Sequence, residues 1–263
     1  IYSIESKKQR PFFISFLFVI SWFVLLYNRA FLNPYQKVTF LNVYQGDCCI
    51  IQDSFSDKVM LIDTGGLVNY DVANKLIMPY LNYHGIRNID IVVITHDDFD
   101  HNGALKDLQN SILIKQIIDN QEVENVNLGK IEFTNINSKT TDKNDKNDNS
   151  IVLYGNIGGT NFLFTGDISS NVEEKLIKEH DLDVDVLKVA HHGSSTSTSQ
   201  KFLEAINTKY AIISVGRNYY GHPTKQVLDN LSKYDVIVYR TDIDGSIRFV
   251  FKSNDLLFIE KAK

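Results

Sequence analysis

The chain has 263 residues, of which 43% are hydrophobic and 22% are charged, so it has enough length and apolar content to fold around a core. Its formal net charge of -5 argues against a broad basic surface that binds nucleic acid unaided, although a metal ion can supply positive charge locally. The two cysteines, Cys48 and Cys49, are adjacent in the sequence. Because neighbours in a strand point to opposite faces, we expect both to pack as thiols without a disulfide between them.

The N-terminal region contains an uncharged apolar stretch, PFFISFLFVISWFVLLY, at residues 11–27. Its length is near the lower limit of about 17–25 residues for a membrane-spanning helix, and it is apolar on all sides. Basic residues precede it at Lys7, Lys8 and Arg10. The positive-inside tendency then predicts a cytoplasmic basic flank at residues 1–10, a single-pass transmembrane helix at 11–30 and an extracytoplasmic domain at 31–263. A cleaved signal peptide is the alternative, although no clear cleavage site follows. The chain starts at Ile1 rather than Met, so we expect it to be part of a longer protein.

The rest of the sequence alternates strand and helix signals, which is typical of an α/β fold. β-rich runs predict strands at residues 37–44, 48–53, 58–63, 89–95, 113–118, 151–154, 161–165, 183–190 and 210–215, and more strands close the chain. Helical spacing predicts helices at residues 69–83, 103–108, 169–180, 199–206 and 224–231. The polar segment 137–150 lacks apolar periodicity and is predicted to be a solvated loop. Two β-rich halves, each with helices, suggest a four-layer sandwich in which helices cover two packed sheets.

Side chains that can bind metals follow several of these strands. They are His96, Asp98, Asp100 and His101 in THDDFDH, Asp167 in FTGD, His191 and His192 in VAHHGSS, and His222 in YGHP. Loops at strand ends are where a rigid sheet can bring side chains together, and imidazole and carboxylate are ligands for zinc, manganese or iron. A lone Asp after a strand is usually a turn residue, but five of the seven histidines follow this pattern with acidic partners. The group therefore predicts a site for one or two divalent metal ions.

The order of these motifs resembles the metallo-β-lactamase superfamily, in which H-x-H-x-D-H follows a strand, an Asp in a GD turn bridges two metals, and a later His completes the second site. Here Asp98 stands where the second His of that motif is usual. This variant resembles the extracellular domain of ComEC-type DNA-uptake proteins, through the stretches LNVYQGDCCII, LIDTGG, ITHDDFDHNG, NDNSIVL, FLFTGD, LKVAHHGSS, ISVGRNYYGHP and RTDIDGSI. The resemblance covers about residues 38–248 and implies the αββα metallo-β-lactamase fold with manganese-dependent nuclease activity.

The metal ligands that the resemblance implies are His96, Asp98, Asp100, His101, Asp167 and His191. His191 is preferred to His192 only narrowly, since adjacent residues after a strand can point either way. The superfamily's third-motif His is absent, and Asn149 and Ser150 stand in that region. Because oxygen ligands make a site harder than imidazoles do, we expect manganese to be favoured, with zinc as the other candidate.

Phosphodiester hydrolysis is the predicted reaction, because a divalent ion can lower the pKa of water and hold a phosphoryl oxygen. The residues predicted to act in catalysis are Asp100, which orients the water, His192, which lies near the substrate, and His222, which contacts the phosphate or protonates the leaving oxygen. Lys188, Ser194 and His222 are the predicted phosphate contacts, with a strand-edge charge as the alternative for Lys188. Asp63 is predicted to orient a metal-binding His from behind, and Asp47 to act similarly or to form a turn.

The predicted function is degradation of one DNA strand during DNA uptake in natural transformation. The expected partners are single-stranded DNA, the membrane, and a DNA-uptake channel with the competence machinery. One alternative is a surface phosphodiesterase of the same fold that acts on a non-nucleic-acid substrate such as a phosphorylcholine ester. The other is a catalytically weak DNA-binding module of an uptake channel, and the intact set of ligands around Asp100 and His101 argues against it.

Overall fold

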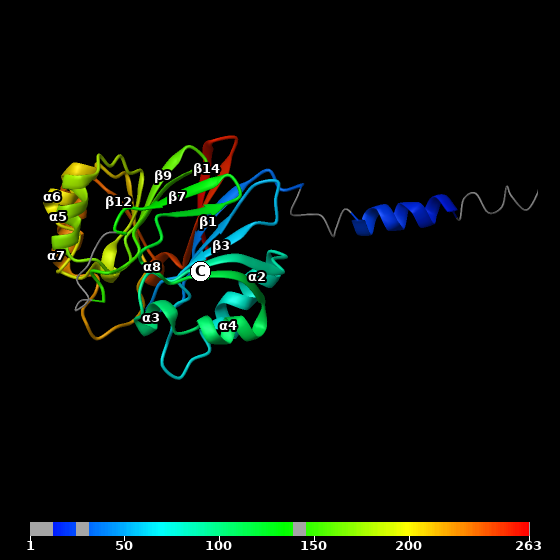
Figure 1. The fold of residues 1–263 in the computed structure, drawn as a ribbon, viewed down its shortest axis with the longest axis horizontal. Coiled ribbons are helices and arrows are strands. Elements are labelled where there is room, and N and C mark those ends of the chain that lie inside the picture. The colour runs from blue at the N-terminus through cyan, green and yellow to red at the C-terminus, as the bar shows by residue number, and fades with distance from the viewer. Residues whose placement is uncertain (1–12, 25–31, 139–145, 263) are drawn as a thin grey trace, which may run out of the picture.

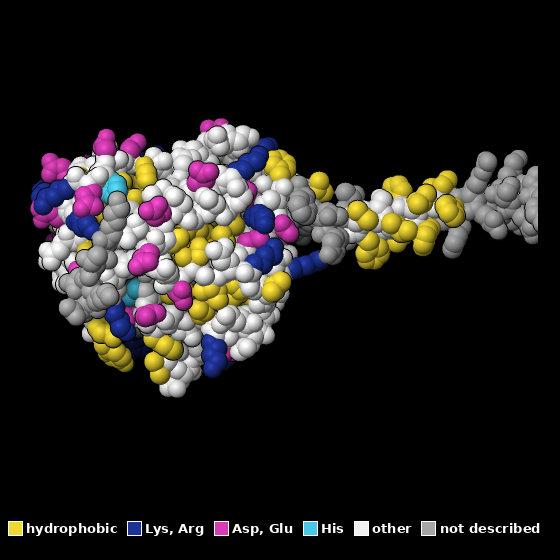
Figure 2. Space-filling view, in the orientation of Figure 1, with side chains coloured by type: hydrophobic (Ala, Val, Ile, Leu, Met, Phe, Trp, Pro, Cys, Tyr) yellow, Lys and Arg dark blue, Asp and Glu magenta, His cyan; other side chains and the backbone are white. Residues whose placement is uncertain are grey.

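The computed structural model describes residues 13–24, 32–138 and 146–262. Residues 13–24 form a helix whose hydrophobic side chains are exposed, as Figure 2 shows. Among the described helices, none is both long enough and apolar enough to cross a membrane. The predicted transmembrane segment 11–30 lies partly outside the described residues, so this segment and the domain boundaries drawn from it stay predictions.

The first of two sheets has seven strands in the order β14-β13-β1-β2-β3-β4-β5. Its strands are β1 (Gln36–Phe40), β2 (Cys49–Gln52), β3 (Val59–Ile62), β4 (Asn88–Val93), β5 (Leu113–Ile118), β13 (Ser246–Lys252) and β14 (Asp255–Ala262). β3, β4 and β5 run parallel to one another, whereas the other neighbours are antiparallel. The sheet is therefore mixed, with its parallel part at one edge.

The second sheet also has seven strands, in the order β12-β11-β10-β9-β8-β7-β6. Its strands are β6 (Asn125–Leu128), β7 (Ile131–Asn135), β8 (Leu153–Ile157), β9 (Thr160–Phe164), β10 (Val186–Lys188), β11 (Tyr210–Ile213) and β12 (Ile237–Arg240). β9 to β12 are parallel, and β6 to β9 form an antiparallel meander. Each sheet thus combines a parallel part, joined by helices, with antiparallel strands.

Helices cover the outer face of each sheet (Figure 1). The first sheet carries the π-helix η2 (Ala73–Ile77), α2 (Met78–Tyr83) and α4 (Leu105–Ser111), and the second carries α5 (Ser170–Glu179), α6 (Gln200–Ile206) and α7 (Lys225–Lys233). Shorter helices lie in the loops: α3 (Phe99–Asn102), the 3-10 helix η3 (Ala190–Gly193) and α8 (Thr241–Asp244). The predicted four layers, with helices outside two packed sheets, are confirmed.

Aromatic side chains fill the space between the sheets. The ring centroids of Phe40 in β1 and Phe164 in β9 are 5.9 Å apart and stacked, which joins the first sheet to the second. Phe162 meets Phe249 edge to face at 5.7 Å, again across the sheets. Such rings bury large apolar areas, so the inner faces of the two sheets are held together mainly by hydrophobic burial.

The parallel strands decide where the metal-capable residues lie. Ile62 of β3 is level with Val93 of β4, so the loops after these two strands leave the first sheet at the same edge. In the second sheet, Lys188 at the end of β10 is level with both Phe164 of β9 and Ile212 of β11. The carboxyl ends of parallel strands therefore bring together loops that are far apart in the sequence.

Two predicted features differ from the structure. The hairpin of β6 and β7 was not predicted, because its strands are only four and five residues long. The predicted solvated loop at 137–150 is wrong at both ends, where Asn137 and Ser150 are buried and the Asn137 amide donates to the Ser150 carbonyl at 2.9 Å. Residues 139–145, in the middle of that loop, lie outside the described residues. Cys48 and Cys49 are buried free thiols, as expected.

Candidate metal centre

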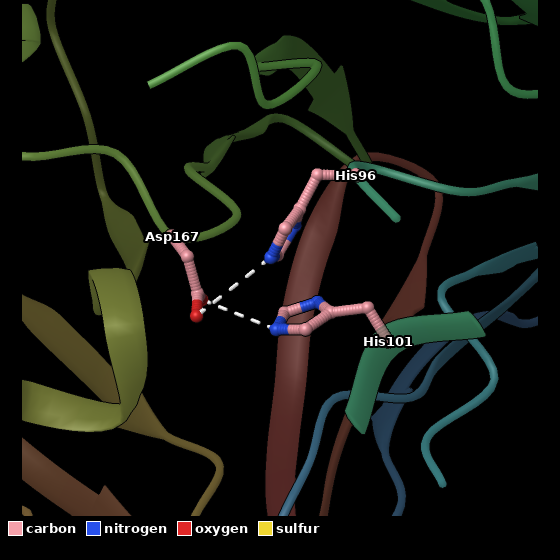
Figure 3. A group of neighbouring side chains, drawn as sticks. All are labelled: His96, His101 and Asp167. Atoms are coloured by element: carbon pink, nitrogen blue, oxygen red, sulfur yellow. Dashed lines mark ion pairs between the residues drawn. The ribbon is translucent and has the colours of Figure 1, made fainter. Parts of the chain in front are cut away.

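Three buried side chains converge where the loops after β4 and β9 meet. His96 follows β4, His101 lies in α3, and Asp167 follows β9. Figure 3 shows both imidazoles pointing toward the carboxylate of Asp167. Nε2 of His101 is 3.2 Å from Oδ1 of Asp167, and Nε2 of His96 is 4.0 Å from Oδ2. Asp98 lies beside this group, with Oδ2 at 3.8 Å from Nε2 of His96 and its side chain 43% exposed. The three buried residues each offer a ligand atom within 4.8 Å of the others, so they could hold one metal ion.

A second group shares a residue with the first. Asp100, His101 and His192 also place their ligand atoms within 4.8 Å of one another. Nε2 of His192 is 3.0 Å from Oδ2 of Asp100 and 3.8 Å from Oδ2 of Asp167. Because Asp167 lies near the imidazoles of both groups, the structure offers two adjacent cation positions with one carboxylate between them.

His101 is oriented by a carboxylate behind it. Nδ1 of His101 is 2.8 Å from Oδ2 of Asp63, which leaves Nε2 available to a metal ion. Asp63 also accepts the backbone N–H of Thr95 at 2.7 Å and the Thr95 hydroxyl at 2.8 Å. Asp63 has a φ of 60° and is buried, so its own conformation is set by the turn that follows β3. Asp63 therefore lies where the predicted orienting role requires it.

The paired histidines occupy different environments. His191 and His192 both have left-handed backbone conformations, with φ of 51° and 52°. His192 is buried, and its Nδ1 donates to the carbonyl of Ser214 at 2.8 Å, which turns Nε2 toward Asp100. The side chain of His191 is 31% exposed, with Nε2 at 3.8 Å from Oδ2 of Asp167. The structure therefore groups His192 with Asp100 and His101 and leaves His191 on the open side, whereas the sequence narrowly favoured His191 as the ligand.

The turn that carries Asp167 is held by a residue whose role was not predicted. The backbone N–H of Asp167 donates to Oγ of Ser150 at 3.1 Å, and the Ser150 hydroxyl donates to the carbonyl of Asn147 at 2.7 Å. Gly166 has a φ of 53°, and a Cβ at this position would lie 2.6 Å from Cβ of Ser150. In the sequence, Ser150 stands only in the region where the superfamily's third-motif His is absent. Its position after a polar loop gave no sign that it positions the central carboxylate.

A buried ion pair lies behind the two best-buried imidazoles. Nζ of Lys188 is 2.6 Å from Oδ2 of Asp47 and donates to the carbonyl of Val189 at 2.9 Å. Oδ1 of Asp47 is 3.6 Å from Nδ1 of His192, and Oδ2 is 3.9 Å from Nδ1 of His101. Asp47 thus lies behind both imidazoles, in line with its predicted role. The predicted phosphate contact of Lys188, whose side chain is 5% exposed, would require this ion pair to break.

Two further residues predicted to contact the substrate, Ser194 and His222, occupy different environments. Ser194 is buried, and its hydroxyl is 2.9 Å from that of Thr196, so it is already engaged. The ring of His222 is 5.5 Å from that of His191. Burial lowers the pKa of His222, and the neighbouring imidazoles of His191 and His192 lower it further. A neutral His222 is better suited to contacting a phosphate than to donating a proton to the leaving oxygen.

The charges of the buried groups stabilise one another. Burial disfavours the charged form of His101, but the carboxylate of Asp167 and a second carboxylate raise its pKa well above the usual value. Burial likewise opposes ionisation of Asp167, yet the neighbouring imidazoles hold its pKa well below the usual value. Asp100, despite its burial, has a pKa lowered to about 2 by His192. Burial lowers the pKa of His96. These directions leave the carboxylates ionised and ready to bind a cation at neutral pH.

The donor atoms fit a divalent cation. Nε2 of His96, Nε2 of His101 and Oδ1 of Asp167 are buried and have no hydrogen-bond partner among the described residues. Buried polar atoms without a partner are uncommon in folded proteins, and these three face one another. Imidazole nitrogen together with carboxylate oxygen is a donor set that zinc, manganese and iron accept. A bound ion would satisfy all three atoms at once.

Comparison with known proteins identifies the class of this domain. A family model described as a beta-lactamase superfamily domain matches residues 41–212, so the chain belongs to that superfamily. The metallo-β-lactamase fold protein YhfI from Bacillus subtilis has the same fold, with a TM-score of 0.56 and 14% identity over 80% of this chain and 97% of that one. The predicted α/β metallo-β-lactamase fold is therefore confirmed. This fold implies divalent metal ions and is consistent with a metal-dependent hydrolase.

Curated relatives include competence proteins of the ComEC type, which confirms the resemblance. ComE operon protein 3 of Bacillus subtilis is 28% identical over 269 residues, which cover 87% of this chain and 35% of that protein. Competence protein ComA of Neisseria gonorrhoeae is 30% identical over 224 residues, which cover 81% of this chain and 32% of that protein. The chain thus spans about a third of the length of these relatives.

Proposed function

We propose that this domain hydrolyses phosphodiester bonds with bound divalent ions, and that its substrate is one strand of DNA during uptake in natural transformation. The convergence of His96, His101 and Asp167 on one point is the observation that carries the hydrolase part. The names of the curated relatives, a ComE operon protein and a competence protein, support the DNA-uptake part.

Each residue of the centre has a role that its position supports. The residues that would hold the ions are His96, Asp98, Asp100, His101, Asp167 and His192. A bound divalent ion supplies a lower pKa for water and positive charge for a phosphoryl oxygen. Asp100 is ionised and its side chain is 32% exposed, so it can accept a hydrogen bond from the attacking water and orient it. His222, on the open side, contacts the phosphate as a neutral imidazole.

Manganese is the metal that we favour. Asp98, Asp100 and Asp167 bring carboxylate oxygens to the centre, and oxygen donors are harder than imidazole nitrogen. Zinc is the second candidate because His96 and His101 add two nitrogen donors to the same site.

The location of the domain is part of the same proposal. The uncharged stretch within residues 11–30 would attach the chain to the cell membrane, with the folded domain outside the cytoplasm beside a DNA-uptake channel. The basic flank at residues 1–10 and the exposed hydrophobic side chains of helix 13–24 support this arrangement. A protease-protection assay on intact cells that express the tagged chain would test it, because a cytoplasmic domain would resist external protease.

The hydrolase proposal is tested by manganese-dependent cleavage of single-stranded DNA by the 263-residue chain. Asp100→Asn should lower the rate by at least about 100-fold, since it removes both a ligand and the group that orients water. Asp97→Asn is the matched control, because Asp97 is exposed and lies in the same motif. Cleavage of phosphorylcholine esters without cleavage of DNA would favour a surface phosphodiesterase. Binding of DNA without cleavage of either substrate would favour a DNA-binding module.

A further inference from the structure

The loop at residues 217–222 follows β11. The chain lies next to the metal centre just before this loop and again at its far end. Just before it, the carbonyl of Ser214 accepts the Nδ1 hydrogen of His192 at 2.8 Å. At its far end, the ring of His222 is 5.5 Å from that of His191. The residues between these two points therefore lie at the rim of the centre, on the side where His191 is exposed.

The backbone of this 217–222 loop is ordered without help from its aromatic side chains. Oδ1 of Asn218 accepts the backbone N–H groups of Tyr220 and His222, each at 3.1 Å. Nδ2 of Asn218 donates to the carbonyls of Gly216 at 3.0 Å and His222 at 2.8 Å. Gly216 packs against the backbone of Tyr44 so closely that a Cβ would lie 2.5 Å from its carbonyl carbon. One amide and one close backbone contact thus hold the loop in place.

The side chains that the loop presents are aromatic and cationic. Tyr219 is 101% exposed and Tyr220 is 78% exposed, so neither ring contributes to the core. The Tyr220 ring is 5.8 Å from that of His222 and inclined to it by 30°, so one of the exposed rings lies directly beside the imidazole next to the centre. Arg217 is exposed and forms no ion pair within the part of the chain that the structure describes. Single exposed hydrophobic residues are common, but two adjacent rings and a free guanidinium beside a metal centre are not a typical surface.

We propose that the 217–222 loop holds the unpaired bases of the DNA strand, with Tyr219 and Tyr220 stacking on bases next to the scissile phosphodiester and Arg217 contacting a neighbouring phosphate. This inference rests on the proposed function and adds how the substrate is held. Aromatic side chains stack on any base, which gives binding that tolerates sequence. The bases of a duplex are already paired and stacked, so such a loop would favour a single strand. Because the net charge of the chain is -5, strand binding has to come from local contacts of this kind.

Binding of a short fluorescein-labelled oligothymidylate, measured by anisotropy, tests the role of the tyrosines. All proteins are the 263-residue chain and carry Asp100→Asn so that cleavage does not interfere. The double substitution Tyr219→Ala and Tyr220→Ala should weaken binding about tenfold or more for each ring lost, since base stacking on aromatic residues has that magnitude. The Phe substitutions at both positions should restore it, because the rings and not the hydroxyls do the stacking. Tyr83→Ala is the matched control, since Tyr83 is 82% exposed at the end of α2, away from the loop.

The role of Arg217 has a separate readout. Arg217→Gln should weaken binding of the same oligonucleotide and reduce the slope of log affinity against log salt by about 0.7, as expected for one phosphate contact on a single strand. An unchanged slope would overturn the phosphate contact. Unchanged oligonucleotide binding in the double alanine variant would overturn the stacking proposal. A protein segment would then be the remaining candidate to contact the two exposed tyrosines. An equal loss on an abasic oligonucleotide would overturn it too, since that probe offers no bases.

Failure of the hydrolase proposal would look different. With Asp100 intact and manganese present, the double alanine variant should lose at least about tenfold more activity on the oligonucleotide than on an abasic oligonucleotide of the same length, which is a diester without bases. If the native protein cleaves neither substrate while the tyrosine substitutions still weaken oligonucleotide binding, the hydrolysis proposal fails and the stacking proposal stands.

Discussion

Replacing Asp63 with Asn tests whether the carboxylate behind His101 determines the affinity of the centre for metal. In the native protein, Oδ2 of Asp63 is 2.8 Å from Nδ1 of His101, and the side chains are 1% and 0% exposed. Oδ1 of Asp63 accepts the backbone N–H of Thr95 at 2.7 Å, a donor that cannot be reversed. The amide oxygen of Asn should therefore keep that bond, and its NH2 group should face His101. His101 would then carry its proton on Nε2, the atom that faces Asp167.

The size of the effect follows from this geometry. Loss of a group that orients a metal-binding His lowers metal affinity by about 10- to 100-fold, or about 1.4–2.7 kcal/mol. We expect the upper half of this range for Asp63→Asn, because the other orientation of the amide would set its NH2 group against the Thr95 N–H. The favoured orientation avoids that clash only by placing the His101 proton on Nε2, the atom that has to bind the metal, so neither orientation suits both Thr95 and a bound ion.

Manganese titration by calorimetry, with circular dichroism to verify folding, would measure the loss. Asp90→Asn is the matched control, because Asp90 is also a buried carboxylate and accepts a backbone N–H, that of Val59, at 3.0 Å. Asp90 lies near the start of β4, whereas His96 follows the end of that strand. Native-like affinity in Asp63→Asn, or an equal loss in Asp90→Asn, would refute the reasoning.

Metal binding should release protons, and its affinity should increase as the pH rises. Carboxylates raise the pKa values of His101 and His192 despite their burial, and a cation needs these imidazoles neutral. Calorimetry in buffers of different ionisation enthalpy would count the protons released. Asp90→Asn should destabilise the fold at neutral pH by about 1–3 kcal/mol. The loss of stability caused by Asp90→Asn should shrink in acid. Burial opposes ionisation of Asp90, but lysine and backbone partners lower its pKa, so its stabilising effect is lost as the pH falls through the lowered pKa. Denaturant titrations at several pH values would measure this change. Cys48 and Cys49 should react with a thiol reagent only after unfolding, since burial raises both pKa values and leaves no thiolate to attack.

The general position of the centre could be predicted from sequence because one geometric rule governs it. Polar residues that follow parallel strands share an edge of the sheet, so His96 after β4 and Asp167 after β9 had to lie near the same rim once two sheets packed face to face. Alternating strand and helix signals predicted those parallel strands. The four layers and the convergence of acidic and imidazole groups therefore needed no knowledge of individual side-chain directions.

The directions of the His191 and His192 side chains could not be predicted, because they depend on two consecutive left-handed residues. Residues with a Cβ rarely adopt this conformation, and no local sequence signal reports two in succession. The ion pair between Lys188 and Asp47 could not be predicted either. A Lys at the end of a strand is usually exposed, and only the packing of the loop after β1 against β10 reveals that Asp47 covers it.

Lys188 can act on the centre in two ways, and substitutions can separate them. A phosphate contact would have to displace its ion pair with Asp47, in which Nζ is 2.6 Å from Oδ2. A role through Asp47 would instead neutralise a carboxylate that lies 3.6 Å from Nδ1 of His192 and 3.9 Å from Nδ1 of His101. Without Lys188, the charge of Asp47 would favour protonated imidazoles and so weaken metal binding at neutral pH.

Lys188→Met should therefore destabilise the fold by about 3–5 kcal/mol, because it leaves Asp47 as an unpaired buried charge. Adding Asp47→Asn removes that charge and should restore most of the stability, measured by denaturant unfolding, and most of the metal affinity, measured by calorimetry. If Lys188 contacts the phosphate, the double variant should differ only in DNA binding. Metal affinity and stability would recover, but DNA binding would stay as weak as in Lys188→Met. Recovery of all three properties together would show that Lys188 acts on the centre through Asp47, since a side chain that touches the substrate cannot be replaced by removing its neighbour.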